Sequence, residues 1–143
     1  MLIALFFSIL GLIQTLLLMF LFNPTIAAFQ FQSFGLIGID GISLWLVWLV
    51  HVLMPIVILS SWKAINVLIK PFIILILLTG FWCTAVFIVL DLLLFYISFE
   101  GVLIPMYLLI GFYGSRNRKI HAAYQFFLYT LIGSLFLLLA LIV

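Results

Sequence analysis

Five apolar runs, each close to the length needed to cross a lipid bilayer, constrain this chain more than any other feature. A transmembrane helix needs about 20 apolar residues, because each residue advances about 1.5 Å through a hydrocarbon layer about 30 Å thick. None of the runs shows the strict two-residue alternation of a membrane β-barrel strand. The sequence therefore predicts an all-α transmembrane fold with a surface loop at 23–41 and spans at 1–22, 42–62, 72–90, 92–113 and 124–143.

The composition excludes most other classes of protein. Hydrophobic residues make up 70% of the 143 residues and charged residues only 6%, whereas soluble domains carry roughly 25% charged residues. A soluble enzyme and a disordered segment are thereby excluded. Five basic residues against three acidic ones leave no basic patch for nucleic acid. The single cysteine, Cys83, excludes an internal disulfide.

The loop between the first two spans carries its own pattern. Residues 29–34 alternate between apolar and polar side chains, which is typical of an extended strand. Gly35 and Gly38 follow this segment. We therefore expect a short extended ribbon on the membrane surface.

Charged residues outside the spans predict how the chain is oriented in the membrane. All five Lys and Arg residues lie in the second-to-third and fourth-to-fifth connections, which share one side of a five-span chain. The opposite side carries Asp40 and Asp91 but no Lys or Arg. Because basic loops stay on the cytoplasmic or matrix side, we expect the N-terminus there and Val143 on the other side.

Glu100 is the strongest candidate for a functional residue. It lies eight positions into the fourth span, about 12 Å along the helix and near the middle of the membrane. An ionised carboxylate at that depth costs at least about 2.5–3.5 kcal/mol, so it must face protein or water. Pro105 cannot donate to the Gly101 carbonyl, which weakens the helix beside this acid. The sequence favours an intramembrane proton relay at Glu100, with a structural hydrogen-bonding role as the alternative.

His51 lies in the second span at a depth that would let it meet Glu100. A histidine titrates near neutral pH and can relay protons. A neutral histidine that donates to a backbone carbonyl explains the same position, and the sequence favours that interpretation.

Asp40 and Asp91 precede the second and fourth spans, where we expect their side chains to cap the helices. Tryptophans 45, 48, 62 and 82 fit packing or a membrane-interface belt better than a cofactor site. No metal-binding spacing is present in the sequence.

Four sequence segments together resemble a known family. They are 38–44 (GIDGISL), 91–100 (DLLLFYISFE), 114–120 (GSRNRKI) and 122–130 (AAYQFFLYT), followed by Gly133 and Ser134. This set is similar to the antiporter-like subunits of the proton-pumping NADH:ubiquinone oxidoreductase, respiratory complex I, and to its subunit 4 family in particular. The mitochondrial forms are the most similar.

The resemblance implies a fold, a site and partners. It corresponds to the N-terminal part of a longer subunit built from inverted repeats, so this chain would be a truncated, split-gene or partial product. Glu100 matches the family's essential acid on the corresponding helix. A chain or region carrying the later helices, other membrane-arm subunits and membrane lipids would be its partners. The lysine that pairs with Glu100 would come from that later region.

The function implied by the resemblance is proton translocation coupled to NADH oxidation and ubiquinone reduction, in the mitochondrial inner membrane or a bacterial plasma membrane. NADH, FMN, iron–sulfur clusters and quinone would bind elsewhere in the complex, and we expect no redox cofactor in this chain. A cation/proton antiporter subunit and a purely structural membrane subunit are the alternatives.

Overall fold

The structure, a computed structural model, describes residues 1–26 and 28–143. These residues form five helices and a two-stranded antiparallel sheet. The helices are α1 (Leu2–Leu21), α2 (Gly41–Ser60), α3 (Ile69–Ile88), α4 (Leu92–Tyr113) and α5 (Lys119–Ile142), and the strands are β1 (Gln30–Ser33) and β2 (Ile37–Ile39). Each helix is long and apolar enough to cross a membrane. The predicted all-α transmembrane fold is confirmed.

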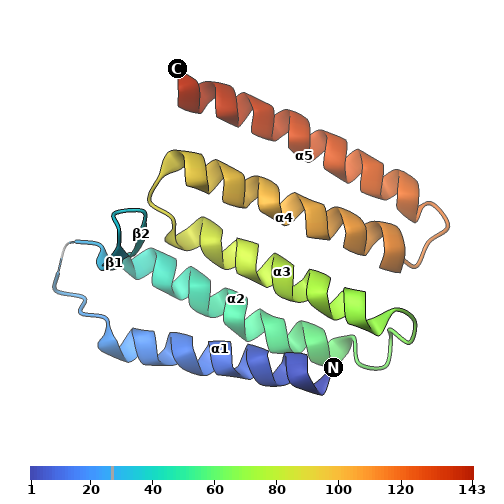
Figure 1. Cartoon of the computed structure of the whole chain (residues 1–143), viewed down its shortest axis with the longest axis horizontal. Helices are drawn as coiled ribbons and strands as arrows, with labels where there is room; N and C mark the ends of the chain where they lie inside the picture. Colours follow the sequence, from blue (N-terminus) through green and yellow to red (C-terminus); the bar gives the residue numbers. More distant parts are fainter. Residues whose placement is uncertain (27) are drawn as a thin grey trace.

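The five helices lie side by side in chain order and alternate in direction (Figure 1). The extensive helix contacts are between chain neighbours: α1 with α2, α2 with α3, α3 with α4, and α4 with α5. The N-terminus and the C-terminus lie at opposite ends of this layer (Figure 1). Residues on α2 and α4 are therefore separated by α3, which matters for the two titratable groups inside the bundle.

Two helices begin several residues before the predicted spans. The helix α3 begins at Ile69 rather than at 72, because Pro71 occupies its first turn, where a missing N–H costs no intrahelical hydrogen bond. The helix α5 begins at Lys119 rather than at 124. The Nζ of Lys119 donates to the carbonyl of Phe112 at 2.9 Å, so this charge stays at the end of the bundle.

The strands β1 and β2 form the hairpin between α1 and α2. Strand β1 lies within the ribbon predicted for 29–34, whereas its pairing with β2 was not visible in the sequence. The turn contains Gly35 at φ +71°, a conformation that glycine adopts without a Cβ penalty. The hairpin also contacts the end of α3: Ile37 bridges Val89, and the Leu90 N–H donates to the Leu36 carbonyl at 2.9 Å.

The two aspartates predicted to be caps behave differently. Asp40 caps α2: its Oδ1 accepts from the Gly41 N–H at 2.7 Å, and its own N–H donates to the Ser43 hydroxyl at 2.7 Å. The prediction for Asp91 is wrong, because its side chain makes no capping hydrogen bond. The chain entering α4 is instead held by the hairpin, through the Leu90 N–H, so the turn does not need the carboxylate.

The buried apolar cluster lies near the end of the bundle where the N-terminus lies. Its members come from α1, α2 and α3: Ala4, Ile58, Phe72 and Ile76. Tyr113 packs on Phe72 edge to face at 4.9 Å and donates to the Leu68 carbonyl at 2.7 Å, which ties α4 to the start of α3. Most large apolar side chains elsewhere are exposed, as lipid-facing residues are in a membrane protein.

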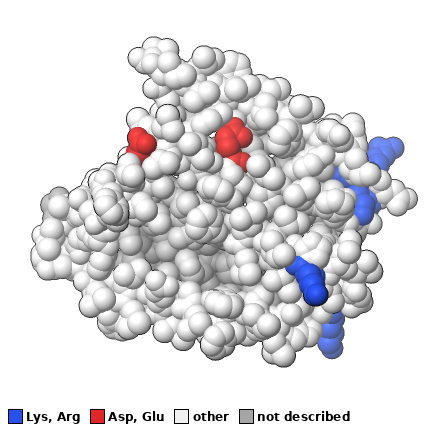
Figure 2. Space-filling view, viewed as in Figure 1, with Lys and Arg blue, Asp and Glu red and all other residues white. Residues whose placement is uncertain are grey.

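Charge is distributed unevenly along the bundle. Lys and Arg gather at one end, on the right of Figure 2, and the visible acidic atoms lie away from that end. The basic residues belong to the α2–α3 connection, the start of α3, the α4–α5 connection and the start of α5. The structure thus places all five basic residues at the end of the bundle where the chain begins (Figures 1 and 2).

Candidate functional site

The carboxyl group of Glu100 lies in the contact between α4 and α5. Two hydroxyl groups donate to the same carboxylate oxygen, Oε1: the phenol of Tyr96, at 3.1 Å, and the hydroxyl of Ser134. Ser134 is only 2% exposed and also contacts the Leu131 carbonyl at 2.8 Å. Glu100 therefore faces protein and not lipid, as the sequence predicted from its depth.

Local helix geometry explains this cluster. Tyr96 precedes Glu100 by four residues, so both side chains lie on one face of α4. Ser134 projects from α5 toward this carboxylate, and its small side chain is almost completely buried in the contact. Both hydroxyls point at one oxygen of the carboxyl group, which fixes the position of the Glu100 side chain.

The helix α3 packs against the backbone of α4 beside Glu100. Gly101 lies against the indole of Trp82 on α3, where an added Cβ atom would lie 2.5 Å from Cδ2. Pro105 is fully buried one turn further along α4. Its ring nitrogen cannot donate to the Gly101 carbonyl, so the helix lacks one hydrogen bond next to the acid, as the sequence predicted.

A cavity of about 330 Å³ opens beside Ser134. Its lining comes from α4 and α5 and contains Phe99, Tyr129, Thr130, Gly133, Ser134 and Leu137. Tyr129 is 76% exposed, so this space is open to the surface of the bundle. Ser134 thus lies between the Glu100 carboxylate and an open, mainly apolar hollow.

Sequence reasoning missed Tyr96 and Ser134 as members of this site. The four-residue spacing of Tyr96 and Glu100 was a usable signal, because such pairs meet on a helix surface. Ser134 follows Glu100 by 34 residues, and nothing in the spacing relates the two. Only the packing of α4 on α5 brings the hydroxyl to the carboxylate.

The structure does not bring His51 to Glu100. His51 lies on α2, and its Nδ1 contacts the Val47 carbonyl one turn earlier at 2.9 Å. The helix α3 lies between α2 and α4 (Figure 1). The meeting of the two titratable groups, which depth alone allowed, does not occur, and the contact with the Val47 carbonyl agrees with the interpretation that the sequence favoured for His51.

The tryptophans take part in packing. Trp45 and Trp48 on α2 meet edge to face at 5.8 Å, and Trp82 packs on Gly101. These contacts agree with the packing role favoured from the sequence.

Comparison with known proteins decides the family. Residues 89–143 match a family described as NADH:quinone oxidoreductase/Mrp antiporter, TM, and this match contains both Glu100 and Ser134. The chain is 52% identical to NADH-ubiquinone oxidoreductase chain 4 of Chondrus crispus over 97% of its length, and 49% identical to that of Arabidopsis thaliana over 99%. The corresponding protein of Prototheca wickerhamii is 54% identical over 81% of the chain.

The chain belongs to the NADH-ubiquinone oxidoreductase chain 4 family. It spans 30% of the length of the Chondrus and Arabidopsis relatives and 22% of the Prototheca relative. The description of the matched family also includes the Mrp antiporter, whereas these three chain 4 relatives are all named for the oxidoreductase. The resemblance seen in the sequence is confirmed at the level of the family.

Proposed function

We propose that this chain forms part of the membrane arm of NADH:ubiquinone oxidoreductase and contributes Glu100 to a proton path. The observation that carries this proposal is the carboxylate inside the α4–α5 contact, with two hydroxyl donors on one oxygen. A buried titratable group is what proton transfer in a low-dielectric site requires. The names of the relatives support the choice of complex.

In this proposal Glu100 alternates between two protonation states. The ionised state is stabilised by Tyr96 and Ser134, which donate to Oε1. The neutral state is favoured by the surrounding apolar helices, because an apolar environment penalises charge. The carboxylate takes up a proton and releases it when a cation outside this chain approaches.

We assign that cation to a lysine on a helix of a neighbouring chain or region. The basic residues of this chain gather at one end of the bundle (Figure 2), so a partner at the depth of Glu100 must be supplied from elsewhere. An opposite charge within about 4–6 Å would favour the ionised carboxylate. A structure of the assembled complex with no basic side chain near Glu100 would contradict this assignment.

The proposal places the chain in the mitochondrial inner membrane, with its basic end on the matrix side. The positive-inside rule supports the orientation, and the relatives are chain 4 proteins of algae and a plant. NADH oxidation and quinone reduction belong, in this proposal, to cofactors held by other subunits. The enzymatic contribution of this chain is proton translocation.

The decisive experiment replaces Glu100 by Gln. The amide keeps the shape and accepts the same hydrogen bonds, but it carries no exchangeable acid proton. We expect normal amounts of assembled complex on a native gel, with a steep loss of membrane potential and of coupled NADH oxidation in sealed vesicles. Glu100→Asp retains an acid with a shorter reach, and an intermediate loss is expected.

Asp91→Asn provides the matched control, because Asp91 is an acid at the start of the same helix without a capping hydrogen bond. It should pump normally. Normal pumping by Glu100→Gln at full complex content would show that the acid is structural, and the proton-relay function would be withdrawn.

A further inference from the structure

Two hollows flank the last turns of α4, at the basic end of the bundle. One lies between α3 and α4 and has a volume of about 270 Å³. The other lies between α4 and α5 and has a volume of about 360 Å³. Both are lined by Leu108 and Phe112, and Phe112 is 62% exposed. These two side chains form the α4 ridge, with a hollow on each side.

The hollow between α4 and α5 continues toward the middle of the bundle. A further hollow of about 370 Å³ shares Tyr107 and Leu108 with it and reaches Ile104 on α4 and Phe127 on α5. Ile104 precedes Phe112 by eight residues, which is about 12 Å along the helix. The contact between α4 and α5 thus carries a mainly apolar groove that begins at the basic end and runs into the membrane-spanning part.

Lys119 lies at the end of the α4 ridge. It lines the hollow between α4 and α5, and its Nζ donates to the Phe112 carbonyl at 2.9 Å. An ammonium group has three N–H donors, so two remain for another acceptor. A second lysine, Lys70, belongs to the first turn of α3 and lies in the sequence between Leu68 and Pro71, which both line the other hollow.

The surroundings of Lys119 are positively charged. Arg116 and Arg118 precede it in the α4–α5 connection and are exposed. Lys and Arg gather at this end of the bundle (Figure 2). The three acids of the sequence all belong to other parts of the chain, at the starts of α2 and α4 and within α4: Asp40, Asp91 and Glu100. An anion bound beside Lys119 would therefore meet no like charge of this chain.

We propose that the α4 ridge binds one phospholipid with an anionic headgroup, taken from the surrounding bilayer. The phosphate accepts from the free N–H groups of Lys119, and the neighbouring basic residues add positive potential. One acyl chain lies in the groove between α4 and α5, and the other lies between α3 and α4. Basic pockets between transmembrane helices on the cytoplasmic or matrix side suit acidic headgroups, and apolar grooves suit the chains attached to them.

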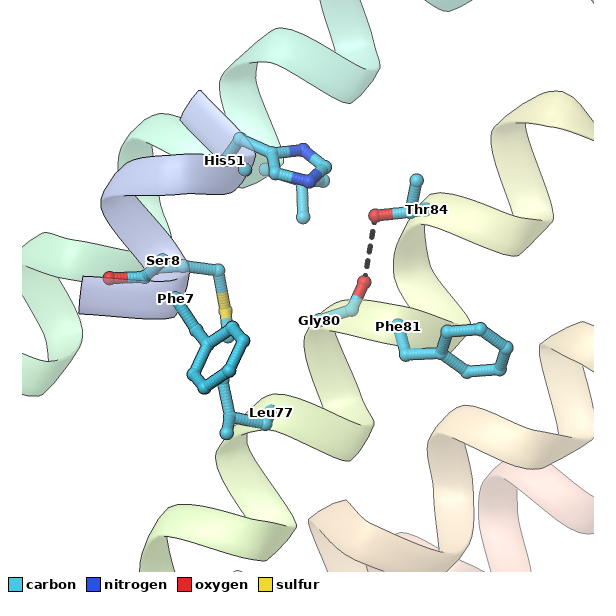
Figure 3. Close-up of a pocket in the computed structure, with 10 residues that line it drawn as sticks. Phe7, Ser8, His51, Leu77, Gly80, Phe81 and Thr84 are labelled. Atoms are coloured by element: carbon cyan, nitrogen blue, oxygen red, sulfur yellow. Dashed lines mark hydrogen bonds between the residues drawn. The ribbon is translucent and has the colours of Figure 1, made fainter. Parts of the chain in front are cut away.

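The hollow between α1, α2 and α3 provides an internal comparison (Figure 3). Its volume is about 210 Å³, and it lies near the middle of α3, beside Gly80. No Lys or Arg is among the described residues that line it. An acyl chain can enter this hollow, but nothing there distinguishes an anionic headgroup from a neutral one.

Photolabelling of the assembled complex in phosphatidylcholine vesicles tests the proposal. The two probes are phosphatidylglycerol, which is anionic, and phosphatidylcholine, which is neutral overall, each with a diazirine on an acyl chain. Light attaches the probe to the residues that it contacts, and mass spectrometry identifies them. At equal probe content, we expect at least about fivefold more phosphatidylglycerol than phosphatidylcholine on both sides of the α4 ridge. The hollow beside Gly80 should take equal amounts of the two.

Lys119→Gln removes the charge but keeps an N–H that can donate to the Phe112 carbonyl. Phosphatidylglycerol label at the α4 ridge should fall about fivefold, the usual contribution of one basic residue near the surface, with phosphatidylcholine label unchanged. Lys63→Gln is the matched control: Lys63 lies at the same end of the bundle, in the α2–α3 connection, and lines none of these hollows. Both variants change the net charge equally, so a general surface potential would respond to them alike.

Filling the groove tests the placement of the acyl chain. Gly111 lines the hollow between α4 and α5, and a Cβ atom there would lie 3.9 Å from that of Ala123, an ordinary contact. Gly111→Leu should therefore remove label between α4 and α5 while label between α3 and α4 stays. If this variant fails to assemble, Ile120→Trp narrows the same hollow from a residue that is 60% exposed.

Four results would overturn the proposal. They are equal label from the two lipids at the α4 ridge, Lys119→Gln indistinguishable from Lys63→Gln, undiminished label between α4 and α5 in the groove-filling variant, or an unlabelled ridge while other membrane helices of the complex are labelled. The last result would mean that another helix covers the ridge. None of these measurements depends on pumping, so the test is independent of the function proposed for Glu100.

Discussion

The indole of Trp82 lies directly on the backbone of Gly101, with no space for a side chain between them. A Cβ atom on Gly101 would meet the ring atoms Cδ2, Cε2 and Cε3 at 2.5–2.7 Å. This contact sets how closely α3 approaches α4 and fixes the helix turn that carries Glu100.

Gly101→Ala should therefore destabilise the chain by about 1–3 kcal/mol, the usual cost of overpacking a tight contact. Assembled complex on a native gel should fall after mild heating. Gly133→Ala is the control, because a Cβ atom on Gly133 would meet no atom within 4 Å. Trp82→Leu should partly rescue Gly101→Ala, and the absence of any rescue would argue against the ring contact as the cause.

Removing the Ser134 hydroxyl tests the hydrogen bond across the α4–α5 contact. A hydrogen bond to a charged group is worth about 1.5–3 kcal/mol, so Ser134→Ala should lower proton pumping roughly ten- to a hundredfold at unchanged complex content. Membrane potential in sealed vesicles is the measurement. Ser98→Ala is the control, since Ser98 is also buried but donates only to the Leu94 carbonyl.

Equal pumping by the Ser134 and Ser98 variants would mean that the hydroxyl does not influence the carboxylate.

The two ends of the bundle should face opposite sides of the membrane. Lys63 lies in the connection after α2, at the basic end, and Gln32 lies in β1 at the other end (Figure 1). In a Cys83→Ser background, Lys63→Cys should react with an impermeant thiol reagent from the matrix side only. Gln32→Cys should react from the opposite side only. Labelling of both cysteines from one side would mean that the segment between them, α2, does not cross the membrane.

The two aspartates at helix starts should differ in their effect on stability. Asp40→Ala removes a side-chain cap and should cost about 1 kcal/mol. Asp91→Ala removes no capping hydrogen bond and should cost less. Thermal unfolding of the purified complex, followed through the release of this chain, measures the difference. An equal effect of both substitutions would contradict the hydrogen bonds described for Asp40.

The five helices could be predicted because the length of an apolar run and the thickness of a bilayer are enough to find them. Glu100 could be predicted because an acid in such a run is rare and costly. Asp40 followed from the local chemistry of helix ends. These features depend on residues that are near one another in the sequence.

The remaining features depend on packing between elements. The partner strand β2, the hairpin contact that replaces an Asp91 cap and the Ser134 donor all join segments that are distant in the sequence. The sequence left open whether His51 meets Glu100 for the same reason: depth along a helix can be counted in residues, but the order of helices across the layer cannot.

Ser134 has one hydroxyl proton and two acceptors within reach, the Glu100 carboxylate on α4 and the Leu131 carbonyl on its own helix. It can serve only one of them at a time. While Glu100 is ionised, the carboxylate is the stronger acceptor and holds that proton. A neutral carboxyl is a weaker acceptor than a carboxylate, so the Leu131 carbonyl would compete more evenly for the same proton. The single Ser134 hydroxyl thus couples the charge of a side chain on α4 to the backbone of α5.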